Sequence, residues 1–267
     1  MIRKIRNLPP LPKTISEIHA LRHSESPDTE ALLRIIQSDP MIMANLLKIS
    51  NSAMYGFSRQ IRTVADAIKM LGFKMVINAV MCTTISRHLK PDLSPYGIDI
   101  ESFTANSSFQ GAIIEQWPDA SFRSIQSDLQ FSAFLQEVGV IVISMMAIEK
   151  NLVQVFQQAL ERYDDQSVAE EAIFGLSSAE VTSIMFSEWK FNQNIIDYIN
   201  GTVDPEKAPE STSIGSRALK IAKMLSPIGK TSMSEESVSK ARERAIAFGL
   251  DESAFEKMIG RITEKLG

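Results

Sequence analysis

The sequence predicts an all-α protein built from many helices. Only 12 glycines and 11 prolines occur in 267 residues, so few residues interrupt long helices. Apolar residues recur at helical spacing, and capping residues stand at the ends of the apolar segments. No segment of useful length alternates polar and apolar residues with the period of two that a half-buried strand shows. Because 44% of the residues are hydrophobic, such a protein can bury a large core.

The first helices follow a proline-rich lead-in at Leu8–Pro12, which favours an extended segment. A helix is expected over residues 13–23, and Ser26 followed by Pro27 predicts the N-cap and first residue of the next helix. This second helix has one apolar face, formed by Ala31, Leu32, Ile35 and Ile36.

The third helix is expected to begin at Asp39 and Pro40, because Asp39 can accept a backbone N–H and Pro40 has none to lose. It is apolar on most sides and is therefore expected in the core. The segment Thr63–Asp66 is typical of a capping box, and its helix should end at Gly72. Another helix is expected over residues 73–89.

A loop over residues 92–99 predicts a boundary between two parts of the chain. We expect an N-terminal helical subdomain, residues 1–99, packed on a second helical bundle, residues 100–267. The helices expected in the second part lie near 100–117, 124–148, 150–163, 166–174, 178–188, 192–200, 214–226, 234–248 and 252–266.

Charge and hydropathy exclude several classes of protein. The formal net charge of -4 gives no electrostatic reason to expect nucleic acid or an anionic membrane as the main partner. No apolar stretch follows the basic N-terminus, and the longest apolar run, Val138–Ile148, is shorter than the roughly 18 residues that span a bilayer. A cytoplasmic location without a membrane partner is expected. The single cysteine, Cys82, is interpreted as a small buried hydrophobe.

Four blocks near the N-terminus follow one another in a specific order: the proline-rich motif, Ile36–Pro40, Leu46–Gly56 and Ile61–Gly72. In these blocks, and near Ala247–Leu250, the chain resembles the HDOD (HD-related output domain) family. The residues that mark the resemblance are Asp39, Pro40, Asn51, Ser52, Tyr55, Gly56 and Gly72. The resemblance implies an all-α fold related to the HD-domain metal-dependent phosphohydrolases, and a role in bacterial signal transduction. For Asn51 and Ser52, a structural role in binding backbone competes with a role in partner binding.

Metal chemistry on the HD fold needs histidine and aspartate ligands on several helices. The positions that the resemblance aligns with these ligands are Asn106, Gln136, Glu137, Ser178, Gly201, Thr202 and Lys223. Among them only Glu137 could bind a metal, and Lys223 would put a positive charge where a cation should sit. Residues 91–267 also contain no histidine. The sequence therefore predicts a degenerate HD-type bundle with no metal, no cofactor and no catalytic residue.

Two histidines earlier in the chain, His19 and His23, have the i, i+4 spacing of some zinc ligands. No glutamate of a metalloprotease motif and no cysteine lie beside them. They are interpreted as part of a half-exposed helix face.

Three functions remain as hypotheses. The first is a non-catalytic signalling module that acts through contacts with unidentified signalling proteins. The second is a sensor of a small ligand or nucleotide that uses the vestigial HD cavity, and the third is a metal-dependent phosphohydrolase, for which fold analogy alone argues. The connection after Asn51 is a candidate docking loop, formed by Met54, Phe57, Arg59 and Arg62. In the competing interpretation, Met54 and Tyr55 fold back onto the neighbouring helices.

Overall fold

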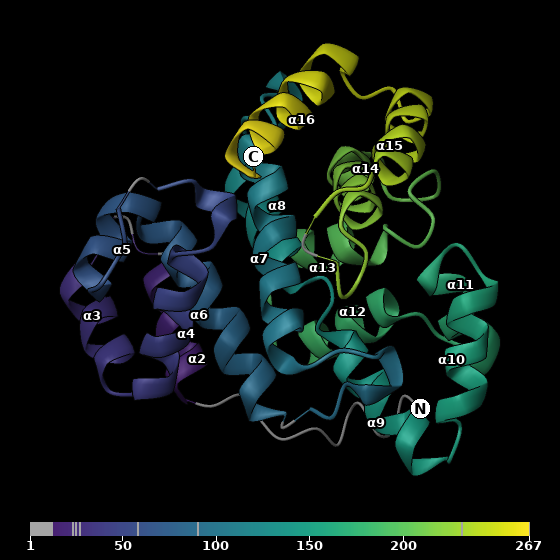
Figure 1. Ribbon diagram of the computed structural model, residues 1–267, viewed down its shortest axis with the longest axis horizontal. Helices are drawn as coiled ribbons and strands as arrows, with labels where there is room; N and C mark the ends of the chain where they lie inside the picture. The colour runs from purple at the N-terminus through teal and green to yellow at the C-terminus, as the bar shows by residue number, and fades with distance from the viewer. Residues whose placement is uncertain are drawn as a thin grey trace. The chain divides into compact units, whose positions relative to one another are not determined.

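The computed structural model describes residues 13–22, 24, 26, 28–57, 59–89, 91–230 and 232–266. Every regular element in these residues is a helix, so the predicted all-α class is confirmed (Figure 1). The motif Leu8–Pro12 and the residues His23 and Pro27 lie outside the described residues.

The described residues form two compact units. The smaller unit consists of residues 13–89 together with 262–266, and the larger unit consists of residues 91–261. The expected subdomain boundary at residue 99 stays a prediction. The loop that precedes it, with the short 3-10 helix η2 (Ser94–Tyr96), belongs to the larger unit.

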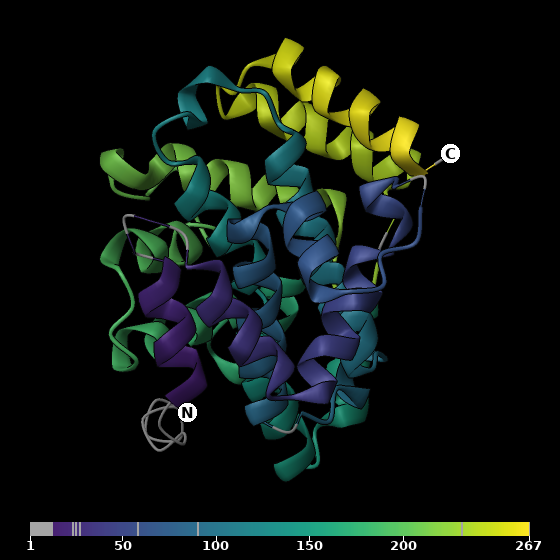
Figure 2. The ribbon, with the colours of Figure 1, turned by 90° about the vertical axis from the view of Figure 1, so that its left-hand side faces the viewer.

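The smaller unit is built around helix α6, which is buried over most of its length. Figure 2 shows the other helices of this unit, purple to blue, grouped around α6, and each of α2 to α5 contacts it. Cys82 lies on α6 and is buried, as expected. The helices of this unit are α2 (Lys13–Arg22), α3 (Thr29–Gln37), α4 (Pro40–Ser50), α5 (Val64–Leu71) and α6 (Phe73–His88), with the 3-10 helix η1 (Ala53–Tyr55) after α4.

Local caps explain where these helices begin. Asp39 accepts the backbone N–H of Met41 at 2.9 Å, which confirms it as the N-cap of α4. The N-cap predicted at Ser26 is wrong, because Asp28 caps α3 by accepting the N–H of Ala31 at 2.8 Å. The carboxylate of Asp28 is a strong acceptor three residues before an N–H that has no helical partner, so it caps the helix in place of Ser26.

The larger unit contains the remaining helices, the last of them up to residue 261. They are α7 (Ile100–Gln116), α8 (Gln126–Leu135), α9 (Gly139–Glu149), α10 (Val153–Arg162), α11 (Gln166–Phe174), α12 (Ser178–Glu188), α13 (Gln193–Asn200), α14 (Glu210–Leu225), α15 (Glu235–Ala247) and α16 (Glu252–Leu266), with the 3-10 helix η3 (Ala120–Phe122). The core lies between α7, α8, α9, α12, α13 and α14, which contact one another in a continuous series. Helix α15 packs on α14 at one side of this core.

The single helix expected over residues 124–148 is wrong, since a turn at residues 136–138 divides it into α8 and α9. Helix α12 crosses at this turn so closely that a Cβ on Gly139 would lie 2.0 Å from the backbone oxygen of Ser178. Thr182 on α12 accepts the N–H of Gly139 at 2.8 Å. Helix α12 therefore supplies a hydrogen-bond acceptor for the N–H of Gly139, which a continuous helix would supply from its own backbone.

The segment Gln126–Glu149 is the one segment of the described residues that is long and apolar enough to cross a membrane. In its most apolar window, 89% of the residues are buried inside the protein. Its hydrophobicity is therefore explained by its place in the core of the larger unit.

Candidate functional site

A cavity of about 480 Å³ lies in the larger unit. Its walls are the turn between α8 and α9, the start of α11, the last turns of α14 and one face of α15. The charged residues on these walls are Glu137, Asp164, Asp165, Glu236, Lys220, Lys223, Lys240 and Arg244. Two of them, Glu137 and Lys223, are at positions that the resemblance to the HDOD family aligns with the ligands of an HD metal site.

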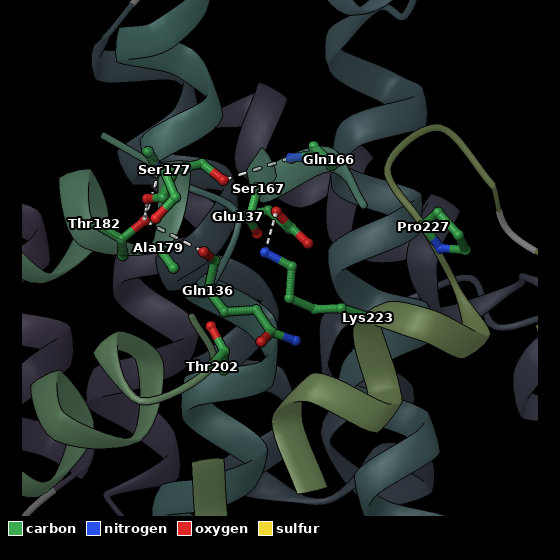
Figure 3. A network of polar contacts seen from close by, with 12 residues as sticks. Gln136, Glu137, Gln166, Ser167, Ser177, Ala179, Thr182, Thr202, Lys223 and Pro227 are labelled. Carbon is green, nitrogen blue, oxygen red and sulfur yellow. Dashed lines mark hydrogen bonds and ion pairs between the residues drawn. The ribbon is translucent and has the colours of Figure 1, made fainter. Parts of the chain in front are cut away.

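Glu137 and Lys223 form a buried ion pair at the floor of this cavity. Lys223 Nζ lies 3.3 Å from Glu137 Oε2, and Figure 3 shows the ammonium pointing at the carboxylate. The side chains are 1% exposed for Glu137 and 10% for Lys223. Burial by itself would lower the pKa of Lys223, but the carboxylates of Glu137, Glu170 and Asp165 outweigh burial and raise this pKa. Lys223 is therefore held in its charged form.

A second buried carboxylate, Glu170 on α11, lies behind this pair. It accepts hydrogen bonds from the backbone N–H of Ser178 at 2.5 Å and from the hydroxyl of Tyr96 at 2.7 Å. The amide of Gln166 donates to it at 2.7 Å. Burial raises the pKa of Glu170, although Lys223 and these donors oppose the rise. Burial and the neighbouring carboxylate also raise the pKa of the Tyr96 hydroxyl well above its ordinary value.

A third carboxylate, Asp165, connects the start of α11 to α14. It caps α11 by accepting the N–H of Ser167 at 2.9 Å, and Lys220 Nζ lies 2.6 Å from its other oxygen. Burial alone would raise the pKa of Asp165, but Lys220 and the backbone donor hold it below its ordinary value. This pair is fixed because one partner is part of a helix cap.

Side-chain amides complete the buried network. Asn106 Nδ2 lies 2.8–3.1 Å from four oxygens of the segment 226–230, which it thereby ties to α7. Gln110, one turn later on α7, donates to Glu137 Oε1 at 3.2 Å and accepts from Gln136 Nε2 at 2.8 Å. Asn106 and Gln136 thus bind protein groups and do not line the cavity.

The other aligned positions also have local roles. Ser178 is the first residue of α12 and gives its N–H to Glu170. Gly201 allows α14 to approach, because a Cβ there would lie 2.1 Å from Ser216 Oγ. Thr202 Oγ1 donates to the backbone oxygen of Ile199 at 2.7 Å. None of these three lines the cavity.

This donor set does not fit the metal centre that the HD fold implies. Of the aligned positions, one is a carboxylate, and an ammonium neutralises it. Nowhere in the part of the chain that the structure describes do three His, Cys, Asp or Glu side chains come together as metal ligands. We therefore derive no chemical step through a metal ion.

In the smaller unit, Asn51 binds backbone, as its position at the helix end predicts. Its Nδ2 donates to the carbonyls of Leu47 at 2.7 Å and Ile61 at 2.8 Å, and its Oδ1 accepts the N–H of Ile61 at 2.7 Å. Asn51 therefore closes the connection between α4 and α5. Gly56 has a φ of 58°, the left-handed conformation that ends η1, and Gly72 has a φ of 86° between α5 and α6. Ser52 is exposed, and its side chain does not cap η1.

The candidate docking loop is partly buried. Met54 and Tyr55 are 5% and 7% exposed, and the Tyr55 hydroxyl lies 3.7 Å from Met75 Sδ. Phe57 is half-buried and stacks on Tyr55 with ring centroids 6.2 Å apart. Arg59 and Arg62 are exposed. Met54 and Tyr55 thus pack inward, while the docking role of the other three stays a prediction.

Sequence reasoning missed Glu170, Tyr96, Gln110 and the pair of Lys220 with Asp165. Two of these have a signal in the sequence: Gln110 stands four residues after Asn106, and Lys220 stands three residues before Lys223, so each shares a helix face with a predicted position. Nothing local marks Glu170, because its partners come from distant segments.

Comparison with known proteins decides the family. The HDOD domain profile matches residues 8–205, about three quarters of the chain. The chain belongs to the HDOD family. Among solved structures, this chain is similar to the crystal structure of a suspected phosphohydrolase from Shewanella amazonensis SB2B, at 21% identity and a TM-score of 0.73, with 100% of this chain and 97% of that chain covered.

A second similar structure is that of a suspected signal transduction protein from Marinobacter aquaeolei VT8. Its identity to this HDOD chain is 21% and its TM-score is 0.69, with 98% of this chain and 59% of that chain covered. A curated relative, an uncharacterized protein of Treponema pallidum (strain Nichols), is 21% identical over 209 residues, which are 78% of this chain and 40% of the relative. The HDOD chain thus spans less than half the length of this relative. At these identities the structural likeness establishes the fold.

Proposed function

We propose that this HDOD chain is a non-catalytic regulatory module of bacterial signal transduction, which acts in the cytoplasm by binding other signalling proteins. The observation that carries the proposal is the buried ion pair of Glu137 with Lys223. The pair lies at the floor of the cavity, and the sequence resemblance aligns both residues with metal ligands of the HD fold.

The electrostatic repulsion between the Lys223 ammonium and a metal cation supports a site without metal. Two unit charges 4 Å apart repel by about 4 kcal/mol at an effective dielectric of about 20, so Lys223 repels a divalent ion beside it by about twice that energy and offsets the attraction of Glu137. Loss of the proton from Lys223 would remove the repulsion. The raised pKa of Lys223 opposes this loss.

Two further observations support a role in protein contacts. Phe57, Arg59 and Arg62 present aromatic and cationic groups, which are enriched in protein interfaces, on the connection after Asn51. The similar protein from Marinobacter aquaeolei carries the name of a suspected signal transduction protein, and this HDOD chain covers 59% of it.

An assay of phosphoester hydrolysis tests the proposal. The purified chain is incubated with p-nitrophenyl phosphate and bis-p-nitrophenyl phosphate, each with Mn²⁺ or Mg²⁺, and its bound metals are measured by elemental analysis. We expect no stoichiometric transition metal and no turnover above that of Glu137→Gln. Metal-dependent turnover that folded Glu137→Gln lacks, and that the exposed control Lys257→Gln retains, would show an enzyme instead; circular dichroism checks that Glu137→Gln is folded.

The cavity favours a second candidate function, the sensing of a small molecule. Its volume of about 480 Å³ lies within the range of about 300–1,000 Å³ typical of small-ligand sites. In this function the ligand would regulate the module without being converted.

A further inference from the structure

We propose that this cavity binds a small organic anion with at least two negative charges and a hydroxyl group beside one of them. Lys223 would bind the anion at the floor, and Lys240 and Arg244 would bind it at the mouth. The inference deepens the sensing function and names its ligand class. It rests on the proposal that the site does not convert what it binds.

The buried pair of Lys223 with Glu137 has incomplete hydrogen bonding. Lys223 Nζ and Glu137 Oε2 are both buried, and neither makes a hydrogen bond to the described residues. An ammonium has three donors, and the one close acceptor lies 3.3 Å away. Buried polar groups in proteins are normally hydrogen-bonded, so both atoms indicate a missing partner. An anionic oxygen would satisfy the ammonium, and a hydroxyl would satisfy the carboxylate oxygen.

A pair of cations on α15 also lines the cavity. Lys240 and Arg244 stand four residues apart on α15, so they share a face, and both line the cavity. Their side chains are 54% and 47% exposed. Two cations at the mouth and one at the floor match an anion that carries at least two negative charges.

The walls also carry four acidic side chains, Glu137, Asp164, Asp165 and Glu236, so an anion must displace or share the partners of the basic residues. Glu137 is neutralised by Lys223, and Asp165 is fixed by Lys220 and by its role as a helix cap. The partners of Lys240, Glu236 at 2.9 Å and Asp164 at 3.7 Å, are 77% and 97% exposed. Ion pairs this exposed contribute little, so a ligand can displace them.

The ion pair of Arg244 is also weak. Its nearest carboxylate, Glu206, is 3.9 Å away and 67% exposed. The guanidinium lies over the ring of Phe248, 4.6 Å from its centroid, which fixes its direction. Arg244 therefore keeps donors for an anion, and guanidinium groups bind carboxylate and phosphate oxygens in pairs.

Binding is tested with the full chain and four probes. Citrate is a hydroxylated carboxylate, and ribose 5-phosphate is a hydroxylated phosphate ester. Tricarballylate is citrate without its hydroxyl group, and inorganic phosphate lacks the organic part of the ester. Calorimetric titration gives the dissociation constant at fixed ionic strength, and thermal unfolding gives the shift in Tm. We expect citrate or ribose 5-phosphate to raise the Tm by several degrees at about 100 times its dissociation constant. Tricarballylate should bind several-fold more weakly than citrate, and phosphate more weakly than its ribose ester.

Matched variants locate the site. Lys240→Gln with Arg244→Gln should weaken binding at least tenfold, since two charge-assisted hydrogen bonds are lost. Lys150→Gln with Lys257→Gln removes the same charge from exposed positions outside the cavity and should bind as the unchanged chain does. Both variants change exposed side chains only, so both should fold, which circular dichroism checks.

The inference is overturned if neither hydroxylated anion binds, or if the two double variants bind equally. Response to citrate alone would identify a carboxylate ligand, and response to ribose 5-phosphate alone a phosphate ester; either supports the site. Failure to bind leaves the non-catalytic proposal intact. Hydrolysis of ribose 5-phosphate with Mn²⁺ would overturn that proposal separately.

Discussion

Lys223 Nζ lies 3.3 Å from Glu137 Oε2, and this contact joins α14 to the turn between α8 and α9. Both side chains are almost fully withdrawn from water. A charge in such a place depends on its partner, because the desolvation of each ion costs several kcal/mol. The pair is therefore a structural element of the larger unit.

Removal of one partner should strongly destabilise the protein. We expect Lys223→Met to lower the free energy of unfolding by about 3–5 kcal/mol, because Glu137 is left as an uncompensated buried charge. Lys223→Met with Glu137→Gln should recover much of this loss. Urea unfolding measures both variants, and Lys240→Gln, which removes an exposed lysine, serves as the control and should stay within about 0.5 kcal/mol. Equal losses in Lys223→Met and the control would contradict the importance of the pair.

The N-cap of α4 should make stability depend on acid pH. Burial would raise the pKa of Asp39, but the N–H groups of Met41 and Ile42 and the guanidinium of Arg87 lower it. A carboxyl whose pKa is lower in the folded state stabilises the fold above its unfolded pKa, about 3.9, and this stabilisation is lost as pH falls through the folded pKa.

Asp39→Ala should therefore cost about 1 kcal/mol at pH 7, the usual value of an N-cap, and less near pH 3. Asp39→Asn keeps a side-chain acceptor and loses only the partly exposed pair with Arg87, so it should cost less than Asp39→Ala. Urea unfolding at several pH values gives the profile. A cost of Asp39→Ala that is the same at pH 3 and pH 7 would argue against a role of the carboxylate.

Asn51 should be essential to the connection between α4 and α5. Asn51→Ala removes three hydrogen bonds and leaves the N–H and carbonyl of Ile61 without them, so we expect a loss of about 2–3 kcal/mol. The neighbouring variant Ser52→Ala should change the stability by less than about 0.5 kcal/mol, because its exposed side chain makes no cap. Chemical denaturation compares the two. Similar stabilities would mean that the connection holds without Asn51.

In the connection after Asn51, we expect buried residues to affect stability and exposed residues to affect partner binding. Tyr55→Ala should lower stability by a few kcal/mol, as large-to-small changes in a core do, because Tyr55 is buried. Phe57→Ala with Arg59→Ala should leave the Tm almost unchanged while the binding of signalling partners weakens. Quantitative co-purification from native cytoplasm, with the unchanged chain as reference, measures the second effect. Undiminished recovery of the same partners by the folded double variant would exclude this surface.

The sequence by itself determined the helical class and several helix ends. Asp39 with Pro40, Thr63 and Gly72 act on backbone groups within a few residues, so their effect is present in the local sequence. Residue types also predicted that an HD metal site of the usual composition is missing, since residues 91–267 contain no histidine. The family followed from ordered motifs of the same local kind.

Tertiary structure alone decided how the candidate site is built. The division of residues 126–149 into two helices depends on Thr182, which lies more than forty residues further along the chain. Glu170 is buried because Tyr96 and Ser178 supply hydrogen bonds from other segments. The resemblance aligned Lys223 with a metal ligand of the HD fold, and the structure shows that Lys223 pairs with Glu137 and that Lys240 and Arg244 line the same cavity. Contacts between segments distant in sequence depend on how helices pack, and no local pattern of residues records that packing.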